Sequence, residues 1–150
     1  MNRRDLLLAG VGAVALGAGQ ALAAEKPAME GHAHHHMGHG AANQALIDAA
    51  AGCATKGEIC VSHCMDSFAA GDTSLAACAK SVMETMALCQ AVITLAAQNS
   101  KNLAATAKVA MAACKACEDE CRKHEAKHAT CKDCADACVK CYEECKKVAA

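Results

Sequence analysis

The chain has 150 residues and a formal net charge of −1, with 13 cysteines, one Tyr, one Phe, one Pro and no Trp. The near-neutral charge and the scarcity of aromatic rings exclude the basic patches and stacking platforms of nucleic-acid-binding proteins. Apolar residues make up 54% of the chain, but most are Ala and Cys, so something other than large aliphatic side chains must fill the interior. The length predicts a single domain.

Residues 1–23 have the pattern of an export signal. Arg3 and Arg4 precede a moderately apolar run rich in Gly and Ala, as in signals of the twin-arginine pathway. Ala21 and Ala23 are the small residues expected before a cleavage site. The run is short and broken by Gly, which argues against a membrane span that persists after cleavage. We therefore expect export of a folded chain, with a general secretory signal or an uncleaved anchor as alternatives.

Residues 24–42 are predicted to form a disordered tail, since they are rich in Gly and show no hydrophobic periodicity. The potential metal ligands in this tail are Met29, His32, His34, His35, His36, Met37 and His39. A flexible tract of such ligands can capture copper or zinc weakly. A solvated linker or a tag-like segment is the alternative.

The sequence from Asn43 onward is typical of helices. No Gly or Pro follows Gly71, and residues that favour helices dominate. We expect four helices at about residues 43–70, 73–98, 102–127 and 131–148. Four helices joined by short loops predict an all-α fold, an antiparallel up-down-up-down four-helix bundle, over residues 43–150.

Polar residues and Gly mark the predicted helix ends. Asn43 is the expected N-cap of the first helix, and Gly71 is its C-terminal stop. Thr130 is the expected N-cap of the fourth helix, with Asp133 three residues later as in a capping box.

The cysteines follow the spacing of an inward helix face. Between residues 131 and 148 they recur at alternating spacings of three and four, which is the a/d seam of a packed helix. The other helices carry theirs on similar stripes, and charged residues such as Lys132 fall between them. The expected lining consists of Cys53, Cys60, Cys64, Cys78, Cys89, Cys114, Cys117, Cys121, Cys131, Cys134, Cys138, Cys141 and Cys145. The bundle is therefore predicted to have a Cys-lined core.

On the inward face of the second helix, the spacing allows either Met86 or Thr85 at one core position. It predicts Ile93 at a second core position. Met111 lies near the stripe of the third helix. Core packing is the favoured role for both methionines.

Metal binding is the favoured interpretation of the Cys lining. Cysteines three or four apart on a helix have Cβ atoms about 5–6 Å apart, whereas a disulfide needs about 3.5–4.5 Å. An odd number of cysteines also leaves one thiol over. A core of inert thiols is a further alternative, since Cys behaves as a small hydrophobe, but such a core would be underfilled where Leu would pack better.

Charge balance favours copper among the metals that thiolates select, which are Cu(I), zinc and iron–sulfur clusters. Four thiolates around Zn²⁺ keep a charge of about −2, whereas one Cu⁺ per thiolate leaves about zero in the buried core. An even ladder of thiols also suits bridged Cu(I) better than isolated tetrahedral cages. The C-x2-C spacings lack the Gly or Pro of an iron–sulfur loop. A zinc- or copper-binding metallothionein-like protein and an iron–sulfur electron-transfer protein stay open as alternatives.

Repeated C-x3-C spacings carry a family resemblance. They join Cys60 to Cys64, Cys117 to Cys121, Cys134 to Cys138 and Cys141 to Cys145. In this combination the sequence resembles the bacterial copper storage proteins, four-helix bundles with Cys-lined cores, and its signal resembles that of the exported branch of the family. The resemblance implies reversible storage of multiple Cu(I) ions per chain for a copper-accepting cuproenzyme or chaperone. It also implies a homotetramer in the periplasm or in an internal-membrane lumen.

One end of the bundle is predicted to combine cysteine with histidine. Antiparallel packing brings together Cys64, Cys78, Cys121, Cys131, His63, His124 and His128. We expect His63 and His124 to act as ligands or gates where copper enters, with His128 as a further candidate. Histidines that are merely solvated at helix ends are the alternative. The opposite end carries Leu46 and Leu103 and is expected to be plugged.

Nothing in the sequence indicates an enzyme. No Ser/His/Asp arrangement, phosphate loop or carboxylate pair appears at a telling spacing. A redox C-x2-C motif normally lies beside a strand, and no strand is predicted.

Overall fold

The computed structural model describes residues 41–150. The predicted export signal over residues 1–23 and nearly all of the predicted tail over residues 24–42 lie outside the described residues. Within the described part, a short 3-10 helix (Ala41–Asn43) leads into α1 (Gln44–Ala69).

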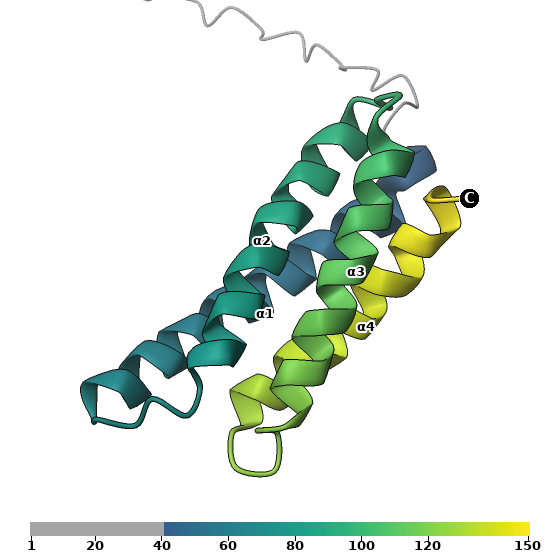
Figure 1. The fold of residues 1–150 in the computed structure, drawn as a ribbon. Helices are drawn as coiled ribbons and strands as arrows, with labels where there is room; N and C mark the ends of the chain where they lie inside the picture. The colour runs from purple at the N-terminus through teal and green to yellow at the C-terminus, as the bar shows by residue number, and fades with distance from the viewer. Residues whose placement is uncertain (1–40) are drawn as a thin grey trace, which may run out of the picture. The chain divides into compact units, whose positions relative to one another are not determined.

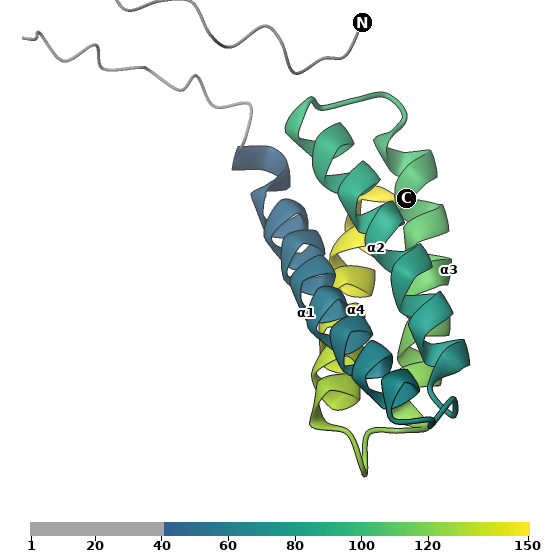
Figure 2. The same ribbon diagram turned by 90° about the vertical axis from the view of Figure 1, so that its left-hand side faces the viewer.

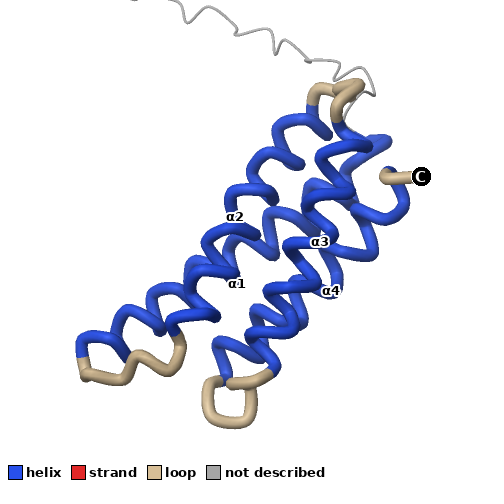
Figure 3. Tube along the Cα trace, in the orientation of Figure 1, coloured by secondary structure: helices blue, strands red, loops and turns tan. Residues whose placement is uncertain are grey.

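Four helices make up the fold: α1, α2 (Ala76–Ala97), α3 (Leu103–Arg122) and α4 (Ala129–Val148). Each packs on its neighbour in sequence, and α1 also packs on α4, which closes the bundle (Figure 1). The α2–α3 loop lies at one end, and the α1–α2 and α3–α4 loops lie at the other (Figure 2). No strand occurs among residues 41–150 (Figure 3). The predicted all-α, antiparallel up-down-up-down four-helix bundle is confirmed.

Two of the helix ends are closed by left-handed residues. Gly71 has a φ of +87°, its N–H donates to the Phe68 carbonyl at 2.9 Å, and the Asp72 N–H donates to the Ser67 carbonyl at 2.9 Å. These two bonds are the Schellman motif that ends α1, so the stop predicted at Gly71 is confirmed. Asn99, with a φ of 49°, takes the same role at the end of α2.

Of the two predicted N-caps, Asn43 has the predicted position and Thr130 does not. Asn43 precedes α1 but makes no capping bond; its amide donates instead to the Ala96 carbonyl at 3.2 Å and to Asn99 at 3.0 Å, which ties the start of α1 to the end of α2. His128, in an extended conformation, occupies the N-cap position of α4, and Thr130 lies inside the helix. The capping box is therefore absent, because α4 begins earlier than its polar residues suggested.

The second helix starts later than expected, at Ala76, and the third ends earlier, at Arg122. Residues 123–128 form turns in which the His124 carbonyl accepts from the N–H groups of Lys127 and His128, each at 3.0 Å. These turns bend the chain toward α4 without a Gly or Pro, which the sequence did not reveal.

The core face of α2 differs from the predicted stripe at two positions. Thr85 and Val92 are buried, whereas Met86 and Ile93 are only half-buried. The Thr85 hydroxyl donates to the Ser81 and Ala113 carbonyls at 2.9 and 3.1 Å, so its buried oxygen is satisfied. Met86 packs instead over Gly57 of α1: a Cβ built at Gly57 would lie 2.7 Å from Met86 Cγ. The packing role expected for Met86 is thereby supported.

The end of the bundle near the α2–α3 loop is filled by small and aliphatic side chains. The buried residues there are Leu46, Ala50, Val92, Ala96, Leu103, Ala107 and Ala149. We call this region the apolar end. By length and composition alone α2 could span a membrane, but it forms one wall of this core.

Candidate metal centre

All 13 cysteines are buried, with side chains no more than 2% exposed, and none forms a disulfide. They come from all four helices, because each helix presents its i, i+3, i+4 stripe to the bundle axis. The predicted inward placement of every cysteine is therefore confirmed.

The sulfurs contact one another between helices. Five pairs of Sγ atoms from different helices lie within contact distance: Cys78–Cys121 at 3.4 Å, Cys53–Cys138 at 3.7 Å, Cys89–Cys141 at 3.8 Å, Cys60–Cys131 at 3.9 Å and Cys117–Cys134 at 4.0 Å. Sulfurs at this separation can share one metal ion or bridge two neighbouring ions.

Larger sets of sulfurs form along the axis. In each of four groups all Sγ atoms lie within 4.8 Å of one another: Cys53/Cys89/Cys114/Cys141, Cys117/Cys134/Cys138, Cys60/Cys121/Cys134 and Cys60/Cys64/Cys78. Cys134 and Cys60 each belong to two groups, and the Cys53–Cys138 contact joins the first group to the second.

Cys131 and Cys145 complete the ladder. Cys131 contacts Cys60, and Cys145 lies one helical turn beyond Cys141 on the buried face of α4. The 13 thiols therefore form one continuous series rather than separate four-ligand cages.

The buried thiols perturb one another's protonation. Burial raises the pKa of Cys64 to about 12 and also raises the pKa of Cys131. Hydrogen bonds from Cys114 and Cys138 lower the pKa of Cys53 to about 5. Hydrogen bonds from neighbouring S–H groups thus favour the thiolate, whereas burial alone favours the protonated thiol. Binding of a cation to these sulfurs displaces the remaining protons.

Three histidines gather at the end where α1 and α3 finish, which we call the histidine end. His63 Nε2 lies 2.8 Å from His128 Nδ1, and the ring centroids of His124 and His128 are 6.4 Å apart. All three are half-buried. The three histidines that the sequence predicts at this end lie together here, and His128 contacts both of the others.

The sequence pattern assigns His128 to the end of a long third helix, and for this reason His128 is predicted only as a further candidate after His63 and His124. The turn at residues 123–128 instead carries it to the start of α4, beside His63. The other expectation for the two ends agrees with the structure: Cys64, Cys78, Cys121 and Cys131 are buried at the histidine end, and Leu46 and Leu103 are buried at the other.

The family model for copper storage proteins matches residues 39–150. The chain belongs to the copper storage protein family. Comparison with curated proteins gives no match.

Two solved structures of this family share the fold. Apo-Csp3, copper storage protein 3 from Bacillus subtilis, is 27% identical with a TM-score of 0.65, and the match covers 72% of this chain and 99% of that one. The Cu(I)-bound copper storage protein BsCsp3 is 26% identical with a TM-score of 0.64, covering 72% and 98%. The bundle described here thus has the architecture of a copper storage protein, and its clustered thiols are suited to Cu(I).

Proposed function

We propose that this protein stores Cu(I) along its core at about one ion per cysteine and releases it to a copper-accepting partner. The continuous ladder of 13 buried sulfurs carries the proposal, because sulfurs shared between groups suit bridging Cu⁺ and balance its charge. The role requires no catalytic group. Membership of the copper storage family supports the same function.

An anaerobic titration separates storage from the alternatives. Saturation near one Cu(I) per cysteine supports storage, whereas a chain that takes up more equivalents of Zn²⁺ than of Cu(I) would favour a metallothionein-like role. Among residues 41–150 a single group offers four mutually close sulfurs, namely Cys53, Cys89, Cys114 and Cys141. We therefore expect one tight Zn²⁺ site at most. Visible colour in the purified protein would favour an iron–sulfur cluster instead.

We further propose that copper enters at the histidine end, where His63 and His124 act as ligands or gates together with His128. The contact of His63 with His128 and the adjacent Cys64/Cys78/Cys60 group support this assignment. Replacing His63 and His124 with Ala should slow loading or release and leave the capacity unchanged. Unchanged transfer rates in the double variant would remove both residues from the mechanism.

Export and assembly are part of the same proposal. The Arg3-Arg4 signal supports export by the twin-arginine pathway to the periplasm or an internal-membrane lumen. Cell fractionation of the wild type and of an Arg3→Lys/Arg4→Lys variant tests this location. The homotetramer follows from the family resemblance, and sedimentation of the metal-free and loaded chains would measure it.

A further inference from the structure

The thiol lining of the core is incomplete at mid-length. On the buried face of α1, Gly57 is the position between Cys53 and Cys60, and it carries no side chain. A Cβ built at Gly57 would lie 3.2 Å from Val82 Cγ1 of α2, so the two positions face each other. The buried face of α2 continues from Val82 to Thr85, again without a thiol. Two of the four helices therefore supply no cysteine at this level.

The other two helices do supply thiols there. Cys117 lies three residues after Cys114 on α3, and Cys138 lies three residues before Cys141 on α4, each one turn nearer the histidine end. The three-sulfur group of Cys117, Cys134 and Cys138 comes from α3 and α4 alone. The next group toward the apolar end takes one sulfur from each of the four helices: Cys53, Cys89, Cys114 and Cys141.

This level, which we call the middle layer, consists of Gly57, Val82, Thr85, Cys117 and Cys138. It separates two sets of thiols. The inner thiols, on the side of the apolar end, are Cys53, Cys89, Cys114, Cys141 and Cys145. The outer thiols, on the side of the histidine end, are Cys60, Cys64, Cys78, Cys121, Cys131 and Cys134.

The two sets are linked only through the thiols of the middle layer, among the sulfur groups and contacts described above for residues 41–150. Cys134, an outer thiol, shares its group with Cys117 and Cys138. Cys138 in turn contacts Cys53, an inner thiol, at 3.7 Å. An ion that moves from one set to the other therefore has to pass along the α3–α4 side of the core.

The remaining side chains of the middle layer are poor substitutes for thiolates. Val82 has no ligand atom, and the Thr85 hydroxyl is a hard oxygen that already donates to two backbone carbonyls. Met86 covers Gly57, but its thioether has no negative charge to balance Cu⁺ in a buried site. Passage of Cu(I) through this layer thus depends on Cys117 and Cys138.

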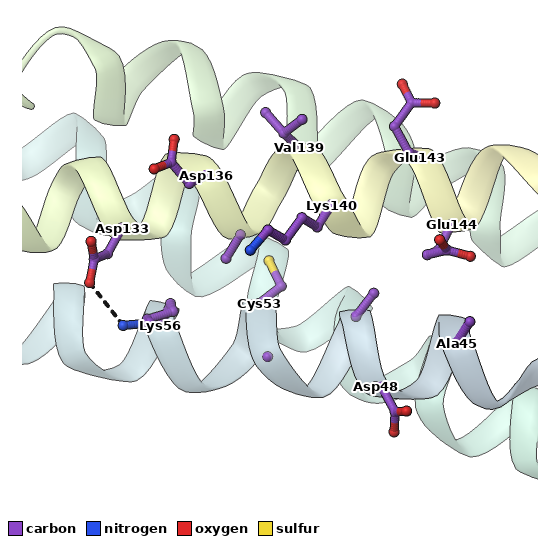
Figure 4. Close-up of a pocket in the computed structure, with 13 residues that line it drawn as sticks. Ala45, Asp48, Cys53, Lys56, Asp133, Asp136, Val139, Lys140, Glu143 and Glu144 are labelled. Carbon is purple, nitrogen blue, oxygen red and sulfur yellow. Dashed lines mark hydrogen bonds and ion pairs between the residues drawn. The ribbon is translucent and has the colours of Figure 1, made fainter.

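The inner thiols have no opening of their own in the part of the chain that the structure describes. Buried residues such as Leu46, Val92 and Leu103 fill the apolar end. A surface groove of about 690 Å³ runs between α1 and α4, and Cys53 is among its lining residues (Figure 4). Cys53 is nevertheless only 2% exposed, so the groove ends at a closed wall.

We propose that the core holds copper in two pools, on the outer and the inner thiols, and that Cys117 and Cys138 are the transfer residues that pass Cu(I) between them. The proposal rests on the storage function above. In the transfer toward the inner pool, a Cu–Sγ bond to Cys134 breaks as one to Cys138 forms. The Cys138 proton moves to the Cys134 thiolate left behind, and copper stays Cu(I). With this single route, the inner pool exchanges more slowly than the outer pool.

Release kinetics test the two pools. The fully loaded chain is mixed anaerobically with an excess of bathocuproine disulfonate, whose Cu(I) complex is coloured. We expect two phases, with about five of the 13 ions in the slow phase, one for each inner thiol. Cys89→Ala should reduce the slow amplitude and Cys64→Ala the fast one. Release of all ions in a single phase, or the reverse assignment of these two variants, would overturn the proposal.

A matched pair of variants on α2 tests the middle layer. Val82→Cys with Thr85→Cys continues the thiol stripe from Cys78 to Cys89, and it should accelerate the slow phase at least about tenfold by offering a second route. Val92→Cys with Ala96→Cys adds two thiols to the same buried face beyond the inner thiols. The second variant should leave the slow rate constant unchanged. Equal slow rate constants in the two variants would overturn the role of the middle layer.

A loss variant keeps the test decisive if the added thiols disturb folding. Cys117→Ala with Cys138→Ala should slow the slow phase at least about tenfold, and the fast phase of the same protein is the internal control. An unaltered slow phase would also overturn the proposal. A wild type that binds no Cu(I) would refute storage itself, whereas full capacity released in a single phase would refute only the division into pools.

Discussion

The two ends of the bundle share one backbone design and differ in what fills it. At the apolar end Leu46, Leu103 and Ala96 are buried against one another's helices, and at the histidine end Cys64, Cys78 and Cys121 take the equivalent inward positions. The helices continue from one filling to the other without a break. The helical spacing thus determines which positions are buried. The side chain at each position determines whether it adds apolar packing or a potential metal ligand.

We therefore expect the two ends to stabilise the protein in different ways. Aliphatic contacts at the apolar end stabilise the metal-free chain, because removing their surface from water is favourable without any ion. The thiol-lined part gains most of its stability when a cation bridges the sulfurs. Four changes test this contrast.

Copper loading should have the largest effect. Each independent site contributes about 4 kcal/mol when free Cu(I) is a thousandfold above its Kd, so several sites should raise the thermal midpoint by at least about 15 °C. Anaerobic circular dichroism of the metal-free and loaded chains measures the shift, and removal of copper by a chelator should reverse it. A loaded chain with the same thermal midpoint as the metal-free chain would contradict a stabilising role for copper in the thiol-lined part.

Truncation of one residue from each region should separate stability from capacity. Leu46→Ala should lower the free energy of unfolding of the metal-free chain by about 2–5 kcal/mol and leave copper capacity unchanged. Cys64→Ala should lower it by only about 1 kcal/mol and reduce the capacity. Urea unfolding and copper titration of both variants provide the comparison. A capacity loss in Leu46→Ala would show that the two regions are not independent.

A rise in pH should weaken the thiol-lined part through Cys64. The pKa of Cys64 rises from its ordinary value of 9.0 to about 12 on folding, so the folded chain binds more protons than the unfolded chain between these values. The stability linked to Cys64 is therefore present below about pH 9 and declines as pH rises toward 12. We expect a loss of at most about 2 kcal/mol between about pH 9 and pH 10.5.

The two truncations serve as matched controls for this pH effect. In urea unfolding of the metal-free chain, Leu46→Ala should shift the whole stability curve and keep its slope against pH. Cys64→Ala should flatten the slope, because it removes a titrating group. Identical slopes in the two variants would exclude Cys64 as the source.

Loss of a surface ion pair at the histidine end should have the smallest effect. Arg122 contacts Glu125 and Asp136 at 2.8 Å and Glu118 at 3.6 Å, which joins the end of α3 to α4. Its side chain is 33% exposed, so Arg122→Met should change the free energy of unfolding by about 1 kcal/mol or less. The difference should shrink further in high salt, and a larger, salt-independent loss would indicate a packing role.

The cysteine positions could be predicted from the sequence because they depend on local periodicity. An alternation of three and four residues fixes one face of a helix wherever the helix goes, so all 13 cysteines were placed correctly. Where the spacing allowed either of two neighbours, the sequence could not decide. Thr85 is buried in preference to Met86 because its hydroxyl reaches the Ala113 carbonyl and because Gly57 leaves room for Met86 outside the axis.

Features that depend on contacts between helices could not be predicted. Asn is a residue type that favours the N-cap position, yet the Asn43 side-chain amide donates to the Ala96 carbonyl at the end of α2, 53 positions away in the sequence. The pairing of His63 with His128 depends on turns at residues 123–128 that carry no Gly or Pro. The groove between α1 and α4, which Cys53 helps to line, likewise requires small residues of α1 and charged residues of α4 to face each other, which no single-helix pattern contains.

The sulfurs of Cys60 and Cys134, each common to two groups, have a consequence for how ions travel. An ion held by one group can acquire a ligand from the next before it gives up its last, since the common sulfur stays bound throughout. If copper fills the core as proposed, migration along the axis would need exchange of only one ligand at a time, without parting the helices. Shared sulfurs would thus allow stored copper to redistribute within the core without the opening of a lid.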